Sequence, residues 1–248
     1  MALICPACGA EQSQFNRLCI HCGAALDGSS PPRPKRWRLL LAKLLPADGE
    51  DAIPWDWQGL LLPEPQGKNG WEVLPELILL GLLVVGSLPI IFGTIDHIST
   101  VEAYLHLPNL IFHEAGHVFF GFFGQFIGSL GGTLGQLLMP LLCFHAFLVR
   151  QRHLFSAAVV FWWFGQNFVE IAPYIKDASV GELPLLGGNI GKHAPYGFHD
   201  WEYLLTETGL IAYDQAIALT SHLLGIGLMV LALVWAAAVV ARQCSSSG

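Results

Sequence analysis

Charged residues are scarce in this chain. Of its 248 residues only 12% are charged and 53% are hydrophobic, whereas about 25% are charged in ordinary soluble domains. This balance excludes a typical soluble globular protein and predicts one that is embedded in a lipid bilayer. The formal net charge is −7 and no long basic tract is present, so nucleic acid is not expected as a partner.

The N-terminus lacks the features of a secretory signal. Its first residues, MALICPACGA, contain neither a positively charged start nor a long apolar run. We therefore expect the N-terminus to be retained in the mature protein.

Cysteine is concentrated at the N-terminus. Cys5 and Cys8 form Cys-Pro-Ala-Cys-Gly, Cys19 and Cys22 form Cys-Ile-His-Cys-Gly, and ten residues separate the pairs. Two-residue spacers followed by Gly allow four thiolates to face one tetrahedral zinc ion. The alternative is that the four cysteines form two disulfides, which requires an oxidising compartment. The pattern predicts a small four-cysteine zinc ribbon over residues 1–26, which depends on the metal because so short a segment cannot bury a core.

A linker is predicted between the ribbon and the apolar part of the chain. Residues 27–72 are rich in Pro, Gly and charge, and within them RWRLLLAKLL could form a short basic amphipathic helix on a membrane surface. Five basic residues lie between Arg33 and Lys43. By the positive-inside tendency they place this side, and the ribbon, in the cytosol. We expect an integral protein of a bacterial inner membrane.

The apolar runs predict an all-α polytopic membrane domain over residues 73–248. About five transmembrane helices are indicated, at about 75 to 95, 100 to 124, 134 to 149, 154 to 176 and 210 to 241. The Gly-rich stretch GSLGGTLGQ, residues 128–136, is a candidate for a re-entrant segment. Alternatively, its glycines allow close packing of helices.

Two histidines and a carboxylate interrupt one of these apolar runs. His113, Glu114 and His117 form His-Glu-x-x-His, and on a helix the two histidines are one turn apart on the same face. Ionisable groups at membrane depth are costly, so a cluster of them indicates a functional site. The pattern predicts a zinc site with an open position for water. Glu114 is the candidate general base, which takes the proton from that water and passes it to the leaving amine. The alternative is a polar packing cluster without metal.

A third ligand is expected from a later helix. Asn167, Glu170, Tyr174 and Asp177 are spaced 3, 4 and 3 apart, which places them on one stripe of an otherwise apolar helix. The segment that follows is polar and contains His199 and Asp200. These two residues could hydrogen-bond a metal ligand, bind the metal in place of a residue from the stripe, or belong to a solvated loop.

In these motifs the sequence resembles the site-2 protease family of intramembrane zinc metalloproteases. The resemblance covers about residues 105 to 180 and rests on His113, Glu114 and His117, on GGTLGQ after them, and on Asn167, Pro173 and Asp177. It implies that Asp177 is the third zinc ligand. Asn167, Glu170, His199 and Asp200 remain candidates for second-sphere or alternative ligands. The chain departs from the family at Lys-Asp-Ala, where members have Leu-Asp-Gly.

Two functions are compatible with these features. The first is a zinc endopeptidase that cleaves membrane-anchored protein substrates, with one catalytic and one structural Zn²⁺. The alternative is a non-proteolytic membrane protein that retains the metal site and recruits protein partners through its ribbon. Only the peptidase needs Glu114 as a base, because only peptide hydrolysis requires a proton to be taken from water.

Overall fold

The computed structural model describes residues 3–4, 11–12, 57–95 and 100–245. The chain divides into two compact units, residues 1–51 and residues 52–248. In the first unit, strands β1 (Leu3–Ile4) and β2 (Glu11–Gln12) pair antiparallel, with Leu3 opposite Gln12. In sequence, these strands flank the first cysteine pair. The four cysteines predicted to bind zinc lie outside the described residues, as does the predicted basic helix.

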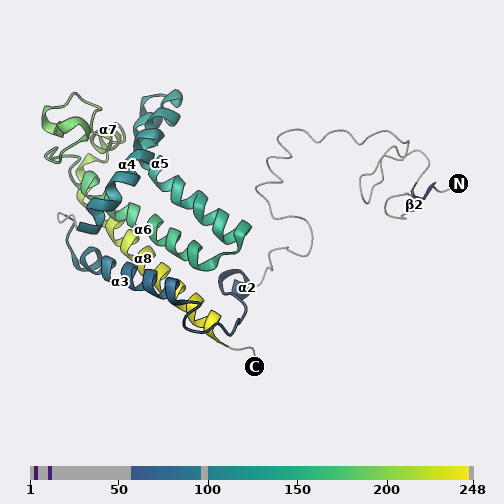
Figure 1. The fold of residues 1–248 in the computed structure, drawn as a ribbon. Helices are drawn as coiled ribbons and strands as arrows, with labels where there is room; N and C mark the ends of the chain where they lie inside the picture. The colour runs from purple at the N-terminus through teal and green to yellow at the C-terminus, as the bar shows by residue number, and fades with distance from the viewer. Residues whose placement is uncertain (1–2, 5–10, 13–56, 96–99, 246–248) are drawn as a thin grey trace. The chain divides into compact units, whose positions relative to one another are not determined.

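Among the described residues of the second unit, every element of three or more residues is helical (Figure 1). The α-helices are α2 (Trp57–Leu61), α3 (Leu74–Phe92), α4 (Thr100–Phe120), α5 (Gln125–His145), α6 (Leu154–Lys176), α7 (Asp200–Glu207) and α8 (Asp214–Cys244). A 3₁₀ turn, η1 (Gly121–Phe123), joins α4 to α5, and a π-helix, η2 (Ala146–Gln151), extends α5. Three further 3₁₀ turns are η3 (Leu186–Gly188), η4 (Gly191–His193) and η5 (Ile211–Tyr213).

Four helical segments among the described residues are long and apolar enough to cross a membrane. They are Leu74–Phe92, Gln125–Gln151, Leu154–Lys176 and Ile211–Cys244. This confirms an all-helical, membrane-type fold. About five spans were expected, and four candidates are found among the described residues. Helix α4, the fifth expected span, is not among them. Polar residues, including His106, Asn109 and Glu114, interrupt α4 and lower its hydropathy.

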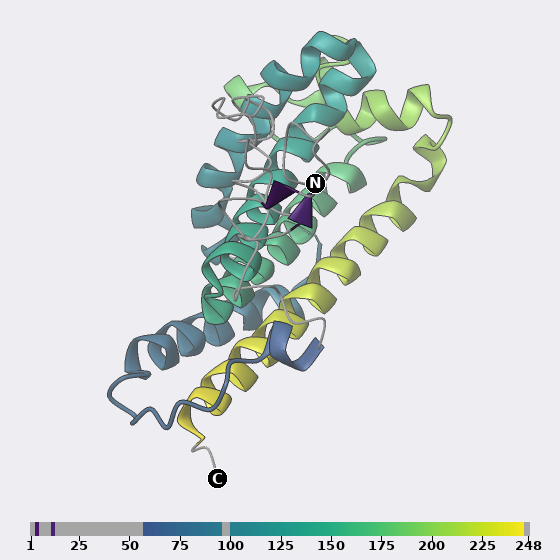
Figure 2. The ribbon, with the colours of Figure 1, turned by 90° about the vertical axis from the view of Figure 1, so that its right-hand side faces the viewer.

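Helices α6 and α8 form the centre of the helical unit, with α3 packed along them (Figures 1 and 2). A Cβ added at Gly225 would lie 2.7 Å from the carbonyl oxygen of Gly165, so glycine at both positions brings the two backbones together. Apolar side chains fill the space beside this crossing; Trp162, Met229 and Ile90 are 5%, 0% and 2% exposed. The crossing holds α6 in place as the support for α4 and α5.

The Gly-rich stretch after the histidines is helical and belongs to α5. A Cβ at Gly116 of α4 would lie 2.0 Å from the carbonyl oxygen of Gly131, and one at Gly135 would lie 2.2 Å from that of Phe112. Only glycine permits so close an approach of two backbones. The re-entrant segment considered for residues 128–136 is therefore wrong, and the alternative of close helix packing is confirmed.

Part of the predicted linker packs against the helical unit. Trp235 of α8 donates a hydrogen bond from Nε1 to the carbonyl of Leu61 (2.6 Å), and Arg152 donates to the carbonyls of Gly59 and Leu60. Residues 57–72 are thus attached to the helices, and Figure 2 shows α2 beside α8.

Candidate metal centre

The two histidines of α4 face one carboxylate. His113 Nε2 lies 3.2 Å and His117 Nε2 lies 3.1 Å from Oδ2 of Asp200. One ligand atom from each of the three residues lies within 4.8 Å of the others, and all three are partly buried. Two imidazole nitrogens and a carboxylate oxygen at this spacing form a set of donors that could hold one divalent cation.

Asp200 reaches the histidines because α7 begins at that residue. His199 precedes it, is 2% exposed, and caps the helix by accepting a hydrogen bond at Nδ1 from the backbone N–H of Glu202 (3.3 Å). Burial alone would raise the pKa of the Asp200 carboxyl, but the two imidazoles that face it outweigh burial and lower this pKa below its ordinary value. Asp200 is therefore held as the carboxylate, the form that binds cations.

The opposite nitrogen of each imidazole has its own partner. His113 Nδ1 lies 2.8 Å from Oε1 of Gln136, and His117 Nδ1 lies 2.8 Å from the carbonyl oxygen of Gly128. Both partners lie on α5. An acceptor on the far nitrogen orients a metal-binding histidine and makes it a better ligand.

Gly132 of α5 leaves room for the three donors. A Cβ at this position would lie 2.5 Å from Nε2 of His113 and 2.5 Å from Nε2 of His117. Those are the two atoms that approach Asp200. A side chain on residue 132 would therefore fill the space in which a shared cation has to fit.

A cavity of about 980 Å³ surrounds this group. Glu114 lines it together with His113, His117 and Asp200, and apolar walls come from residues such as Leu110, Ile171 and Trp201. The side chain of Glu114 is partly exposed. A carboxylate thus lies in the same cavity, one residue from His113 in the sequence.

Asp177 is not brought to the histidines. Its Oδ1 accepts the backbone N–H of Glu182 (2.8 Å) and its Oδ2 accepts that of Leu183 (2.9 Å), while His199 Nε2 lies 3.5 Å from Oδ2. Within the described residues, the group that could hold a metal contains Asp200 in the place expected for Asp177. Asp177 is the C-terminal cap of α6. Its hydrogen bonds with the backbone fix the start of the segment that leads to α7. The structure thus places Asp200, and not Asp177, beside the two imidazoles.

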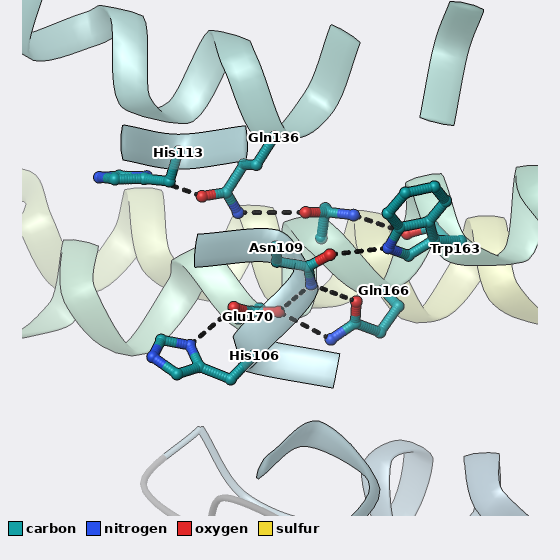
Figure 3. Close-up of polar contacts among 8 residues, drawn as sticks. His106, Asn109, His113, Gln136, Trp163, Gln166 and Glu170 are labelled. Carbon is teal, nitrogen blue, oxygen red and sulfur yellow. Dashed lines mark hydrogen bonds and ion pairs between the residues drawn. The ribbon is translucent and has the colours of Figure 1, made fainter. Parts of the chain in front are cut away.

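Two residues of the polar stripe, Glu170 and Asn167, form hydrogen bonds with side chains of other helices, and Figure 3 shows those of Glu170. Glu170 accepts from the amides of Asn109 and Gln166 and lies 2.9 Å from Nδ1 of His106. Asn167 accepts a hydrogen bond at Oδ1 from Nε2 of Gln136 (3.2 Å). Neither Glu170 nor Asn167 belongs to the metal-binding group in the described part of the chain.

The sequence interpretation missed three features of the site, namely Gln136, the carbonyl of Gly128 and the space at Gly132. All three lie within the Gly-rich stretch that was recognised after the histidines. A glutamine on an apolar helix was a usable signal, because a buried amide requires partners. The sequence pattern contains no signal for the hydrogen bond to the backbone carbonyl of Gly128 or for the space that Gly132 leaves.

Comparison with known proteins assigns no function. No family model matches the chain, and no solved structure matches it. An uncharacterized protein of Synechocystis sp. is 32% identical over 93 residues, which is 38% of this chain and 28% of that protein. The chain therefore spans little more than a quarter of the length of this relative.

Proposed function

We propose that the chain is an intramembrane zinc endopeptidase that cleaves membrane-anchored proteins. The observation that carries the proposal is the convergence of His113, His117 and Asp200 on one point, with Glu114 lining the same cavity. The four apolar helices support a bilayer as the setting of the reaction.

The donor set fits zinc. Two imidazoles and one carboxylate are a common protein ligand set for catalytic zinc, and they leave the fourth position of a tetrahedral ion for water. The carboxylate also reduces the net charge of the site, which matters in a low-dielectric medium. Bound there, Zn²⁺ would lower the pKa of its water and polarise the carbonyl of the substrate.

The chain's own residues supply the remaining steps. Glu114 accepts the proton of the attacking water and later delivers it to the leaving amine, which restores the carboxylate. Asp200 remains unprotonated and would complete the ligand set with the two imidazoles. The apolar walls of the cavity accept an apolar polypeptide segment and keep bulk water from it.

The N-terminal module has a separate role in this proposal. Cys5, Cys8, Cys19 and Cys22 hold a structural Zn²⁺, and the ribbon lies on the cytosolic side, where it contacts a protein partner. The pairing of β1 with β2 on either side of the first cysteine pair supports this reading, because a hairpin brings the ends of the knuckle together.

The test compares Glu114→Gln with the wild-type protein in reconstituted vesicles that contain tagged single-span membrane proteins. An amide cannot accept the proton of water, so we expect zinc content to be retained and cleavage to fall by about 10²- to 10⁴-fold. Glu64→Gln removes an exposed carboxylate that does not line the cavity and should leave cleavage unchanged. Full cleavage by Glu114→Gln, or no cleavage of any membrane substrate by the wild type, would refute the peptidase.

A further inference from the structure

We infer that Gln136 and Asn167 are positioning residues which orient His113 for metal binding and determine which of its nitrogens carries the hydrogen. The inference deepens the proposed function and rests on the metal site that it assigns. Three helices contribute to this chain of contacts: α4 supplies the histidine, α5 the glutamine and α6 the asparagine.

The donors and acceptors in this series of hydrogen bonds are fixed by its last member, Asn167. Nδ2 of Asn167 lies 2.9 Å from the backbone carbonyl oxygen of Trp163, which can only accept a hydrogen bond. The NH₂ group of Asn167 therefore faces Trp163, and its oxygen faces Gln136. That oxygen accepts a hydrogen bond from Nε2 of Gln136 at 3.2 Å.

The same reasoning determines the orientation of Gln136. Since its NH₂ group donates to Asn167, its Oε1 faces Nδ1 of His113 at 2.8 Å (Figure 3). An amide oxygen only accepts, so Nδ1 bears the hydrogen. Nε2, which faces Asp200, is then the nitrogen whose lone pair coordinates the metal.

Because these side chains are buried, water cannot readily take the place of their hydrogen bonds. Gln136 is 5% exposed and Asn167 is 0% exposed. If the glutamine amide were reversed, its NH₂ group would face the Nδ1 hydrogen, and its oxygen would face the oxygen of Asn167. Two buried mismatches of this kind are costly, so the arrangement has one stable direction.

The two metal-binding histidines are thus oriented by different means. His117 Nδ1 lies 2.8 Å from the carbonyl of Gly128, a backbone acceptor that no side-chain substitution removes. His113 depends on a side chain. Residue 136 is therefore the position at which the orientation of one ligand can be altered while the other is left intact.

The test measures metal binding by the full-length protein. Gln136→Leu keeps the approximate size of the side chain and removes the acceptor, so zinc affinity at the membrane site should fall by about 10- to 100-fold. Gln136→Glu restores an acceptor for Nδ1 but places its other oxygen against Oδ1 of Asn167, so it should recover part of that loss. Gln166→Leu is the matched control, because Gln166 is also fully buried but bonds to Asn109 and Glu170 and makes no contact with the metal-binding histidines.

Cobalt substitution separates the two metal sites, since only the cysteine ribbon gives sulfur-to-cobalt absorption in the near ultraviolet. The visible bands of the nitrogen and oxygen site should weaken in Gln136→Leu at limiting cobalt, while the sulfur bands persist. Proton NMR should show a slowly exchanging Nδ1–H of His113 in the wild type that is lost in Gln136→Leu and present in Gln166→Leu.

The outcomes distinguish this inference from the proposed function. Equal zinc affinity in wild type and Gln136→Leu, or an equal loss in Gln166→Leu, would overturn the positioning role while cleavage still supports the peptidase. Failure of Gln136→Glu to recover binding would also overturn it. If the wild-type protein binds no metal at His113 and His117, both proposals fall.

Discussion

The end of α6 and the start of α7 each present an aspartate, and the two aspartates have different roles. The oxygens of Asp177 accept backbone N–H groups of Glu182 and Leu183, whereas Oδ2 of Asp200 faces the imidazoles of His113 and His117. A carboxylate whose oxygens are already bonded to its own loop holds that loop in place. One that faces two imidazole nitrogens at about 3 Å is arranged to share a cation with them.

Removal of Asp200 should have the largest effect. In Asp200→Ala the site retains only two imidazole ligands, so the fall in zinc affinity should exceed the loss of about 10- to 100-fold that removal of an outer partner causes. Zinc stoichiometry of the full-length protein should drop from two ions per chain to one, and cleavage should be lost. Asp177→Ala should retain both ions. The reverse result would return the ligand role to Asp177.

Filling the space at Gly132 should have the next largest effect. The new methyl group of Gly132→Ala would lie 2.5 Å from two imidazole nitrogens, which are side-chain ends that can swing aside. The helices should therefore stay folded while zinc affinity falls by at least about tenfold, as expected when ligands are displaced. Gly227→Ala on α8, where a Cβ would meet nothing within 4 Å, is the control. Unchanged zinc binding in Gly132→Ala would mean that the ion lies elsewhere.

The smallest of these effects should follow from Asp177→Asn. The amide keeps one acceptor but turns a donor toward the other backbone N–H, which leaves a buried group unpaired. A loss of about 1 to 3 kcal/mol in the free energy of unfolding is expected. Denaturant unfolding in detergent measures this loss, and zinc titration of the same sample should be unaltered. A change in zinc affinity without a change in stability would contradict a purely structural role for Asp177.

Much of the helical arrangement was predictable because it depends on local composition. The apolar runs located α3, α4, α6 and α8 and the later part of α5, since length and hydropathy are properties of single segments. The sequence could not show that residues 128–136 continue a helix, because the reason is a contact between glycines on two different helices. Helix α7 was also missed, since it is short and its N-terminal cap is a histidine.

By itself the sequence determined the pairing of His113 with His117 and the presence of Glu114 beside them. A spacing of four residues on a helix brings two side chains to one face, whatever the rest of the fold does. The prediction of cysteine knuckles is equally local, since it uses only the spacing within each pair.

Tertiary structure alone decided which carboxylate lies beside the two imidazoles. Asp177 is the last residue of the polar stripe and Asp200 comes after it in the sequence, and the family resemblance favoured the first. The choice depends on how the segment after α6 folds back, which is governed by the bonds of Asp177 to that segment and by the packing of α7 against α5. Contacts between residues so far apart in sequence arise only when the helices are assembled, so no local pattern contains them.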